Sequence, residues 1–221
     1  ILCPRRLTPK NGVAYAVQAM AAVRDGRVPW PDGEPPLLVV VGHGPQWAEL
    51  RSAVEGGRLE AYCRLEGGRP HPMMPTYFAA ADAVVIPSVN EAGVEEATSI
   101  SALEAMVFGK PVVASAVGGL REIVRDGETG RLVPDRDAVA LARALADLAA
   151  RPEEAARLGA AARRYVLEHH SHLAAARRFV TIYEEVLLNR VAAGREPEIG
   201  GPSAGAGRGR VELLDHFGEE R

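Results

Sequence analysis

Two glutamates, Glu96 and Glu104, stand eight positions apart around the expected start of a helix over Thr98–Phe108. Eight helical positions span about 12 Å, comparable to the reach from a sugar across a pyrophosphate to a ribose. Because a carboxylate accepts hydrogen bonds from vicinal hydroxyls, we predict that Glu104 holds ribose hydroxyls and Glu96 a sugar. In the alternative, Glu96 only complements the helix dipole and Glu104 is a solvated helix residue. Spacing alone does not separate the two.

The start of this helix could also bind an anion. The backbone N–H groups of Ala97, Thr98 and Ser99 are expected to lack partners within the helix. They carry the positive end of the helix dipole, which favours an anion by about 0.3–1 kcal/mol. Carboxylates on both sides of such amides suit a ligand with a diphosphate in its middle and hydroxyls at both ends. A nucleotide-sugar is such a ligand.

A basic loop, Arg5–Gly12, follows the first expected strand and precedes the first expected helix. This position places the loop at the carboxyl edge of a parallel sheet, where open α/β folds bind their ligands. Arg6 and Lys10 are predicted to neutralise the diphosphate and to stabilise it as a leaving group. Only two of the 26 basic residues are lysines, Lys10 and Lys110, so a lysine in this loop is less expected by chance. The alternative is a solvated loop charge.

Two glycine pairs follow expected strands, Gly42 with Gly44 and Gly118 with Gly119. We predict that Gly44, Gly118 and Gly119 let the backbone approach the donor and its phosphates, although they could serve only as turn residues. A dinucleotide cofactor is not predicted, because Trp47 occupies the place of the third glycine in the G-x-G-x-x-G pattern.

The histidines give weaker signals. His71 could lie near a nucleotide base, but a loop histidine more often has no such role. His169, His170 and His172 lack the cysteine or carboxylate pattern that usually completes a metal site. No metal and no cofactor are therefore predicted.

Expected strands and helices alternate along the chain, which predicts an α/β fold: a Rossmann-like open parallel sheet with helices on both faces and a helical C-terminal extension. The expected strands are Ile1–Pro4, Leu37–Val41, Leu59–Leu65, Ala83–Pro87, Pro111–Ala114 and Arg131–Val133. Helices are expected at Asn11–Arg24, Gln46–Glu55, Met74–Ala81, Thr98–Phe108 and Leu120–Val124, and in most of the chain that follows Val133. Residues 1–190 are predicted to form one nucleotide-sugar-binding domain, and residues 191–221 a low-complexity, flexible tail.

Composition limits the class of partner and the compartment. A net charge of −3 provides no general attraction to nucleic acid or to an anionic membrane. The two cysteines show no metal spacing or disulfide framework, so we expect a reducing cytoplasm, with peripheral association at the inner membrane face left open. No apolar run reaches the roughly 20 residues of a transmembrane helix. The chain starts without Met inside an expected strand, and we therefore expect a domain upstream of it.

Residues 95–115, EEATSISALEAMVFGKPVVAS, resemble the donor-site signature of the retaining GT-B glycosyltransferases of family four, the sucrose-synthase and glycogen-synthase-like group. Glu96 and Glu104 match the two glutamates of that signature. The segments VVVGHGP, PTYFAAADAVVIPS and VGGLREIVRDGETGRLV resemble further parts of the same family, so that the likeness covers Pro4–Leu188.

The resemblance implies a transferase that moves a hexosyl group from a nucleotide-diphosphate sugar with retention of configuration. It implies that the donor lies between two Rossmann-like domains, and that the missing N-terminal domain holds an acceptor, which is a glycan, a lipid or a small molecule. In the family an Arg and a Lys of the basic loop, matched by Arg6 and less closely by Lys10, act with the helix amides in place of a metal ion. Neither glutamate is expected to be a nucleophile.

The chain departs from the family pattern at three places. Ala97 stands where the family has Gly, and Thr98-Ser99 replaces Phe-Gly, both at the sugar end of the donor site. Asn11 stands where the family Lys directly precedes the Gly. Two other functions remain open: a non-catalytic homologue that only holds a nucleotide-sugar, and a sugar-nucleotide epimerase.

Overall fold

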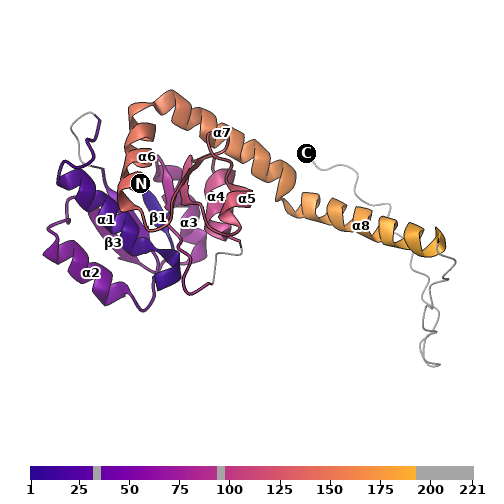
Figure 1. The fold of residues 1–221 in the computed structure, drawn as a ribbon, viewed down its shortest axis with the longest axis horizontal. Helices are drawn as coiled ribbons and strands as arrows, with labels where there is room; N and C mark the ends of the chain where they lie inside the picture. Colours follow the sequence, from indigo (N-terminus) through magenta and orange to yellow (C-terminus); the bar gives the residue numbers. More distant parts are fainter. Residues whose placement is uncertain (32–35, 94–97, 193–221) are drawn as a thin grey trace. The chain divides into compact units, whose positions relative to one another are not determined.

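The computed structural model describes residues 1–31, 36–93 and 98–192, with side chains described through Asn189. Within these residues, six strands form one sheet in the order β3-β2-β1-β4-β5-β6, and every neighbouring pair is parallel (Figure 1). The strands are β1 (Leu2–Pro4), β2 (Leu38–Val41), β3 (Cys63–Gly67), β4 (Val84–Ile86), β5 (Val112–Ser115) and β6 (Arg131–Val133). The predicted α/β fold class is confirmed.

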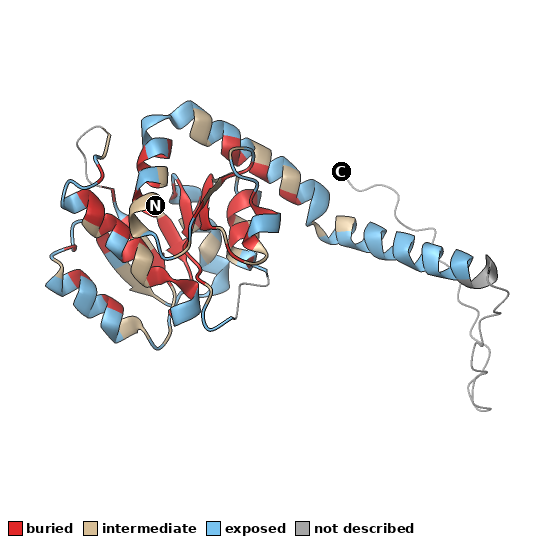
Figure 2. Ribbon diagram, viewed as in Figure 1, coloured by how far each residue is buried: buried red, intermediate tan, exposed pale blue. Residues whose placement is uncertain are grey.

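The central strands are apolar on both faces because helices cover the sheet on both sides. All residues of β4 and β5 are buried, as expected for strands whose residues are almost all apolar. Figure 2 shows the same pattern: the strands in the middle of the domain are buried, and exposure rises on the outer faces of the helices.

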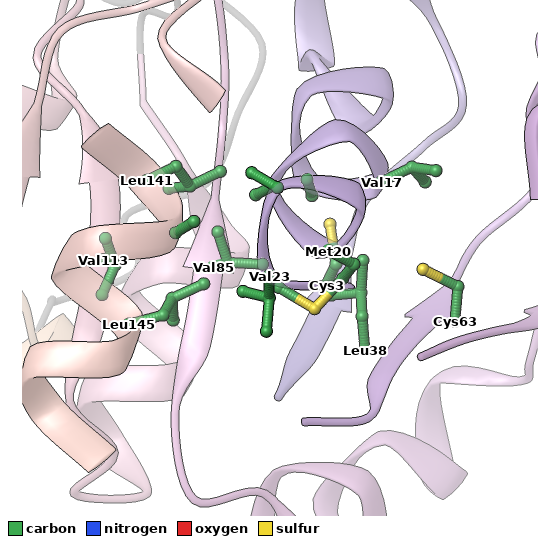
Figure 3. Close-up of a cluster of buried hydrophobic side chains, with 14 of the residues drawn as sticks. Cys3, Val17, Met20, Val23, Leu38, Cys63, Val85, Val113, Leu141 and Leu145 are labelled. Atoms are coloured by element: carbon green, nitrogen blue, oxygen red, sulfur yellow. The ribbon is translucent and has the colours of Figure 1, made fainter. Parts of the chain in front are cut away.

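Helices α1 (Val13–Arg24), α2 (Trp47–Gly56) and α6 (Ala138–Ala150) form one core with the first face of the sheet. Helices α3 (Met74–Ala80), α4 (Ile100–Val107) and α5 (Leu120–Ile123) form a second core on the other face. Helix α7 (Pro152–His169) contributes Leu158 to the first core, and Ala162 and Val166 to the second. Figure 3 shows side chains of the first core, among them Met20, Leu38 and Leu141.

Helix α7 holds α4, the helix of the predicted donor site, by a close backbone approach. A Cβ atom on Gly159 of α7 would lie 2.0 Å from the carbonyl oxygen of Gly109, which follows the C-cap residue Phe108 of α4. Only glycine therefore permits this packing. This contact fixes the C-terminal end of α4, whereas Ser101 in its first turn faces the carboxyl edge of the sheet.

Strand order reverses between β1 and β4. The chain builds β1, β2 and β3 toward one edge, then returns through the 3₁₀ turn η2 (His71–Met73) and α3 to place β4 beside β1 on its other side. In doubly wound sheets the crevice at such a reversal, at the carboxyl ends of the strands, is where ligands bind. The loops that follow β1 and β4 meet here.

Two cysteines lie in the first core and are free. Burial raises the pKa of both thiols, Cys3 and Cys63, to about 12. Because the thiolate is the reactive form of cysteine, both side chains act as small apolar groups at neutral pH.

Strand β3 begins four residues later than predicted. The N–H of Leu59 donates to the carbonyl of Val54 at 2.9 Å, and the N–H groups of Tyr62 and Cys63 donate to the carbonyl of Leu59, each at 2.8 Å. These local bonds close the backbone of Leu59 into a turn. Pairing with β2 therefore starts at Cys63.

The chain divides into two compact units, Ile1–Ala176 and Arg177–Arg221. Helix α8 (His172–Ala192) contains the boundary, and its residues 177–192 are the described part of the second unit. In α8 the rings of Phe179 and Tyr183 stack one turn apart, with centroids separated by 6.4 Å. Residues 193–221, within the predicted tail 191–221, lie outside the described residues. Among the described helices, none has the length and hydropathy of a membrane span.

Candidate functional site

A cleft of about 310 Å³ opens at the carboxyl edge of the sheet. It is lined by Arg5 and Arg6 after β1, His43 after β2, Arg69 and His71 after β3, and Glu104 of α4. Side chains from four strand–loop–helix connections thus line one cleft, because the carboxyl ends of parallel strands lie at the same edge of the sheet. Among the described lining residues, several cationic groups occur together with the carboxylate of Glu104, which suits a ligand that carries both a phosphate and hydroxyl groups.

Glu104, which was predicted to hold ribose hydroxyls, lies on the wall of this cleft. Its Oε1 atom is 2.8 Å from His71 Nε2, and its side chain is 28% exposed whereas that of His71 is 80% exposed. An interaction this open to solvent contributes about 0–1 kcal/mol. The carboxylate is therefore oriented by His71 but is weakly held, and a ligand hydroxyl can compete for it.

Arg6 and Lys10, the two predicted cations, occupy different surroundings. Arg6 is exposed and lines the cleft. Lys10 is exposed on the 3₁₀ turn η1 (Pro9–Asn11), and it is not among the described cleft-lining residues. Its carbonyl accepts a hydrogen bond from the N–H of Val89 at 2.9 Å, which ties η1 to the loop after β4. The structure thus brings Arg6 and Glu104 to one cleft and leaves Lys10 outside it.

The helix that carries Glu104 begins at Ile100, two residues later than the predicted start at Thr98. Ser99 is its N-cap, and its Oγ accepts from the N–H of Ala102 at 3.3 Å. This cap is the physical reason for the difference, because the N-cap residue itself has extended rather than helical backbone angles. The first-turn amides of α4 therefore include those of Ile100 and Ser101, and Ser101 lines the cleft.

Three predicted residues stand directly before that cap. Thr98 is exposed. Glu96 and Ala97 lie outside the described residues, so that their predicted contacts with the sugar and the phosphates remain predictions.

The predicted glycines have structural reasons of their own. A Cβ atom on Gly44 would lie 2.4 Å from the carbonyl oxygen of Leu7, and one on Gly42 would lie 1.9 Å from that of Arg5. These glycines let the loop after β2 pack against the loop after β1. Gly118 adopts a φ of 46°, and Gly119 caps the short helix α5. Among the three predicted glycines, Gly44, Gly118 and Gly119, none is a described cleft-lining residue.

Sequence reasoning included Arg5 in the basic loop but assigned it no role. Arg5 is only 7% exposed, and its guanidinium donates from Nη2 to Asn11 Oδ1 at 2.6 Å and to Ser88 Oγ at 2.8 Å. It also donates from Nη1 to Ser99 Oγ at 3.1 Å. The only sequence signal was an arginine directly after an apolar strand, and the sequence does not say that its partners come from two distant loops.

The loop after β3 holds a second polar group beside the cleft. Arg69 Nη2 donates to Glu66 Oε2 at 2.6 Å, and Tyr77 donates to the same oxygen at 3.3 Å. The hydrogen bond from Arg69 lowers the pKa of the Glu66 carboxyl below its usual value. This pair fixes the start of the loop that carries His71.

Within the described residues, no group of three or more His, Cys, Asp and Glu side chains is arranged to hold a metal ion. His169 and His170 instead contact the ring of Tyr165, with centroid separations of 4.7 and 5.4 Å. Burial is the main cause that lowers the pKa of His170.

Comparison with known proteins identifies the family. The sequence model of the family described as glycosyl transferases group 1 matches residues 1–165. The chain belongs to this family. The predicted resemblance to GT-B glycosyltransferases of family four is therefore confirmed.

A curated relative is the GDP-mannose-dependent alpha-(1-6)-phosphatidylinositol monomannoside mannosyltransferase of Mycolicibacterium smegmatis, which is 33% identical over 76% of this glycosyltransferase-family chain and 43% of its own length. The chain thus spans less than half the length of this relative.

Two solved structures share the fold. Sucrose-phosphate synthase from Thermosynechococcus elongatus aligns with a TM-score of 0.69 and 33% identity over 85% of this chain and 45% of that one. Anabaena HepE, solved in complex with UDP, aligns with a TM-score of 0.72 and 23% identity over 83% of this chain and 48% of that one.

Proposed function

We propose that this chain is the donor-binding domain of a hexosyltransferase, which binds a nucleotide-diphosphate sugar and transfers its sugar with retention of configuration. In this proposal an N-terminal domain outside the chain holds the acceptor. The observation that carries the proposal is the convergence of Arg6, Ser101 and Glu104 on one cleft at the reversal of strand order. These residues offer a cation, a helix N-terminus and a carboxylate acceptor to a single ligand.

The cleft matches the parts of such a donor. The guanidinium of Arg6 and the first-turn amides of α4 supply positive charge for the diphosphate. Glu104 is one turn further along α4 than Ser101, so its carboxylate can accept from the ribose hydroxyls while the phosphates lie at the helix start. The HepE structure was solved with UDP, which supports a nucleoside diphosphate as the ligand class.

The proposed chemistry follows from where charge develops. Breaking the anomeric C–O bond leaves a negative charge on the departing diphosphate, so Arg6 and the α4 amides bind the transition state more strongly than the ground state. Lys10 was predicted to share this role and remains a candidate for it. The acceptor enters on the face of the leaving group. Neither Glu96 nor Glu104 is assigned as a nucleophile, and metal-independent transfer is part of the proposal.

Isothermal titration calorimetry of the chain with UDP, GDP and ADP, each with and without EDTA, tests the donor site. We expect one nucleoside diphosphate to bind with an affinity that EDTA does not change. Binding by none of the three would overturn the proposal. EDTA-sensitive binding would overturn its metal-independent form.

A transfer assay separates an enzyme from a protein that only holds the nucleotide-sugar. The natural full-length protein is expected to release nucleoside diphosphate from the matching nucleotide-sugar when acceptor is supplied, whereas residues 1–221 alone are expected to bind without turnover. Binding without transfer by the full-length protein, across glycan, lipid and small-molecule acceptors, would favour the non-catalytic alternative.

A further inference from the structure

The loop that follows β3 lines the outer part of the cleft. Strand β3 stands at one end of the strand order, separated from β1 by β2. It ends at Gly67, whose φ of 72° is a left-handed angle that glycine adopts without strain. The chain then passes along the cleft, and Gly68, Arg69, His71 and Met74 line it. These residues therefore lie on the side of the cleft that is away from the reversal of strand order between β1 and β4.

The order of groups along the cleft follows the parts of the proposed donor. Arg6 and Ser101 lie at the strand reversal, where the diphosphate is proposed to bind. Glu104, the proposed acceptor for the ribose hydroxyls, lies one turn further along α4 and is 2.8 Å from His71 of the β3 loop. A ligand with its phosphates at the reversal and its ribose at Glu104 thus directs its base toward His71 and Arg69.

Arg69 is a hydrogen-bond donor that Glu66 holds in place. Its Nη2 donates to Glu66 Oε2 at 2.6 Å, and its side chain is 38% exposed. Because a guanidinium carries five N–H donors in a fixed fork, Arg69 can donate to a ligand while it remains paired with Glu66. The carboxylate offsets the charge of Arg69. An uncharged acceptor therefore suits this guanidinium better than a diphosphate does.

The nucleobases differ in what they offer to such a donor. Guanine O6 and uracil O4 are carbonyl acceptors at the position where adenine and cytosine carry an amino donor. A guanidinium has no acceptor atom, so Arg69 pairs with the carbonyl but meets the amino group donor against donor. Recognition of an amino group would need an acceptor at this place, and Glu66 Oε2 already accepts from Arg69 and from Tyr77.

We propose that Arg69 selects the nucleobase of the donor, by binding the ring carbonyl of guanine or uracil and disfavouring adenine and cytosine. This inference rests on the proposed function, because it names the class of nucleotide that the same site takes. Met74 in the same wall offers a polarizable apolar side chain to the ring of the base. Comparison of GDP with UDP distinguishes the two carbonyl bases.

Two pairs of ligands test the selection without a change to the protein. Inosine diphosphate (IDP) and ADP carry a carbonyl and an amino group at the same position of a purine, and UDP and CDP do so on a pyrimidine. The pair that contains the tighter ligand decides. Calorimetry is expected to give at least about fivefold tighter binding for its carbonyl member, because a site that hydrogen-bonds a group rejects the analogue that lacks it. A smaller ratio, or a preference for the amino member, would overturn the proposal.

Variants of two arginines test whether Arg69 is the source of the selection. Arg69→Met keeps much of the side-chain length but removes every donor, so the affinity ratio within the deciding pair is expected to fall at least about threefold. Arg69→Lys keeps one charged group and should retain part of the ratio. Arg64→Met is the matched control, because Arg64 Nη1 lies 3.9 Å from the other oxygen of Glu66 and Arg64 is not among the described cleft-lining residues. A smaller fall in Arg69→Met, or an equal fall in Arg64→Met, would remove the assignment from Arg69.

The outcomes separate the base selection from the proposed function. If the unchanged chain binds none of UDP, GDP and ADP, the proposed function fails, and the base selection fails with it. If ADP binds as tightly as IDP and CDP as tightly as UDP, only the base selection is overturned. The diphosphate and ribose contacts proposed for Arg6 and Glu104 then stand without it.

Discussion

The two edges of the sheet each carry a cavity, and their linings differ in kind. The cleft at the carboxyl edge measures about 310 Å³ and is lined by arginines, histidines and Glu104. The cavity at the amino edge measures about 650 Å³ and is lined mainly by apolar groups such as Trp30, Leu145 and Leu148. The smaller cavity contains the candidate chemistry. Cavity volume is therefore a poor guide to the functional site in this protein. The direction of the parallel strands decides which edge receives loops and helix N-termini.

Substitution at the amino edge should affect stability without affecting binding. Leu145 of α6 is 2% exposed and lines the larger cavity. Leu145→Ala is expected to lower the free energy of unfolding by about 2–5 kcal/mol, because it removes buried methyl groups and enlarges a cavity. Urea unfolding measures this loss. Nucleoside diphosphate affinity, measured well below the unfolding midpoint, should stay within twofold, and a parallel loss of affinity would contradict the separation of the two edges.

At the carboxyl edge the largest single effect is expected from Arg6→Ala. A hydrogen bond to a charged group is worth about 1.5–3 kcal/mol, which corresponds to a loss of about 10- to 150-fold in diphosphate affinity. Calorimetry should show this loss of affinity for the diphosphate and not for the nucleoside. Lys10→Ala tests the other candidate cation, which is not among the described cleft-lining residues, and should change affinity less than threefold if Arg6 carries the role. A larger loss of diphosphate affinity in Lys10→Ala than in Arg6→Ala would assign the diphosphate-binding role to Lys10.

Glu104→Ala should weaken the nucleoside part of binding. Removing the carboxylate is expected to cost about 1.4 kcal/mol, or tenfold in affinity, because two ribose hydroxyls lose their acceptor. The loss should be the same for nucleoside and diphosphate, in contrast to Arg6→Ala. Glu104→Gln keeps one acceptor oxygen, so its nucleotide affinity should lie between that of the unchanged chain and that of Glu104→Ala. Full affinity in Glu104→Ala would show that the carboxylate is only a solvated helix residue.

His71→Ala is expected to have the smallest effect. The pair with Glu104 is largely exposed, and such pairs contribute about 0–1 kcal/mol. Nucleotide affinity should change less than threefold at pH 7, and the melting temperature should not change measurably. A tenfold loss of affinity would instead support the prediction that His71 lies near the nucleotide base.

Much of the fold was predictable because the sheet is covered on both faces. A strand buried on both sides must be apolar throughout, and Val84–Ile86 and Val112–Ala114 are recognisable for this reason. Element ends were predicted less well. The start of α4 depends on the hydroxyl of Ser99 accepting from Ala102, and the start of β3 depends on the turn at Leu59. Both are local hydrogen bonds that hydrophobic patterning does not report.

The sequence by itself determined the order of elements, the parallel sheet and the edge at which Arg6 and Glu104 would meet, because strand direction and loop position follow from chain order. Only the tertiary structure decided which charged groups share the cleft. It left Lys10 outside and brought Arg5 to Ser88 and Ser99, residues 83 and 94 positions away. Such contacts depend on how loops pack after the sheet has formed. Because burying a guanidinium is costly unless its N–H groups are hydrogen-bonded, hydroxyl and amide oxygens surround that of Arg5.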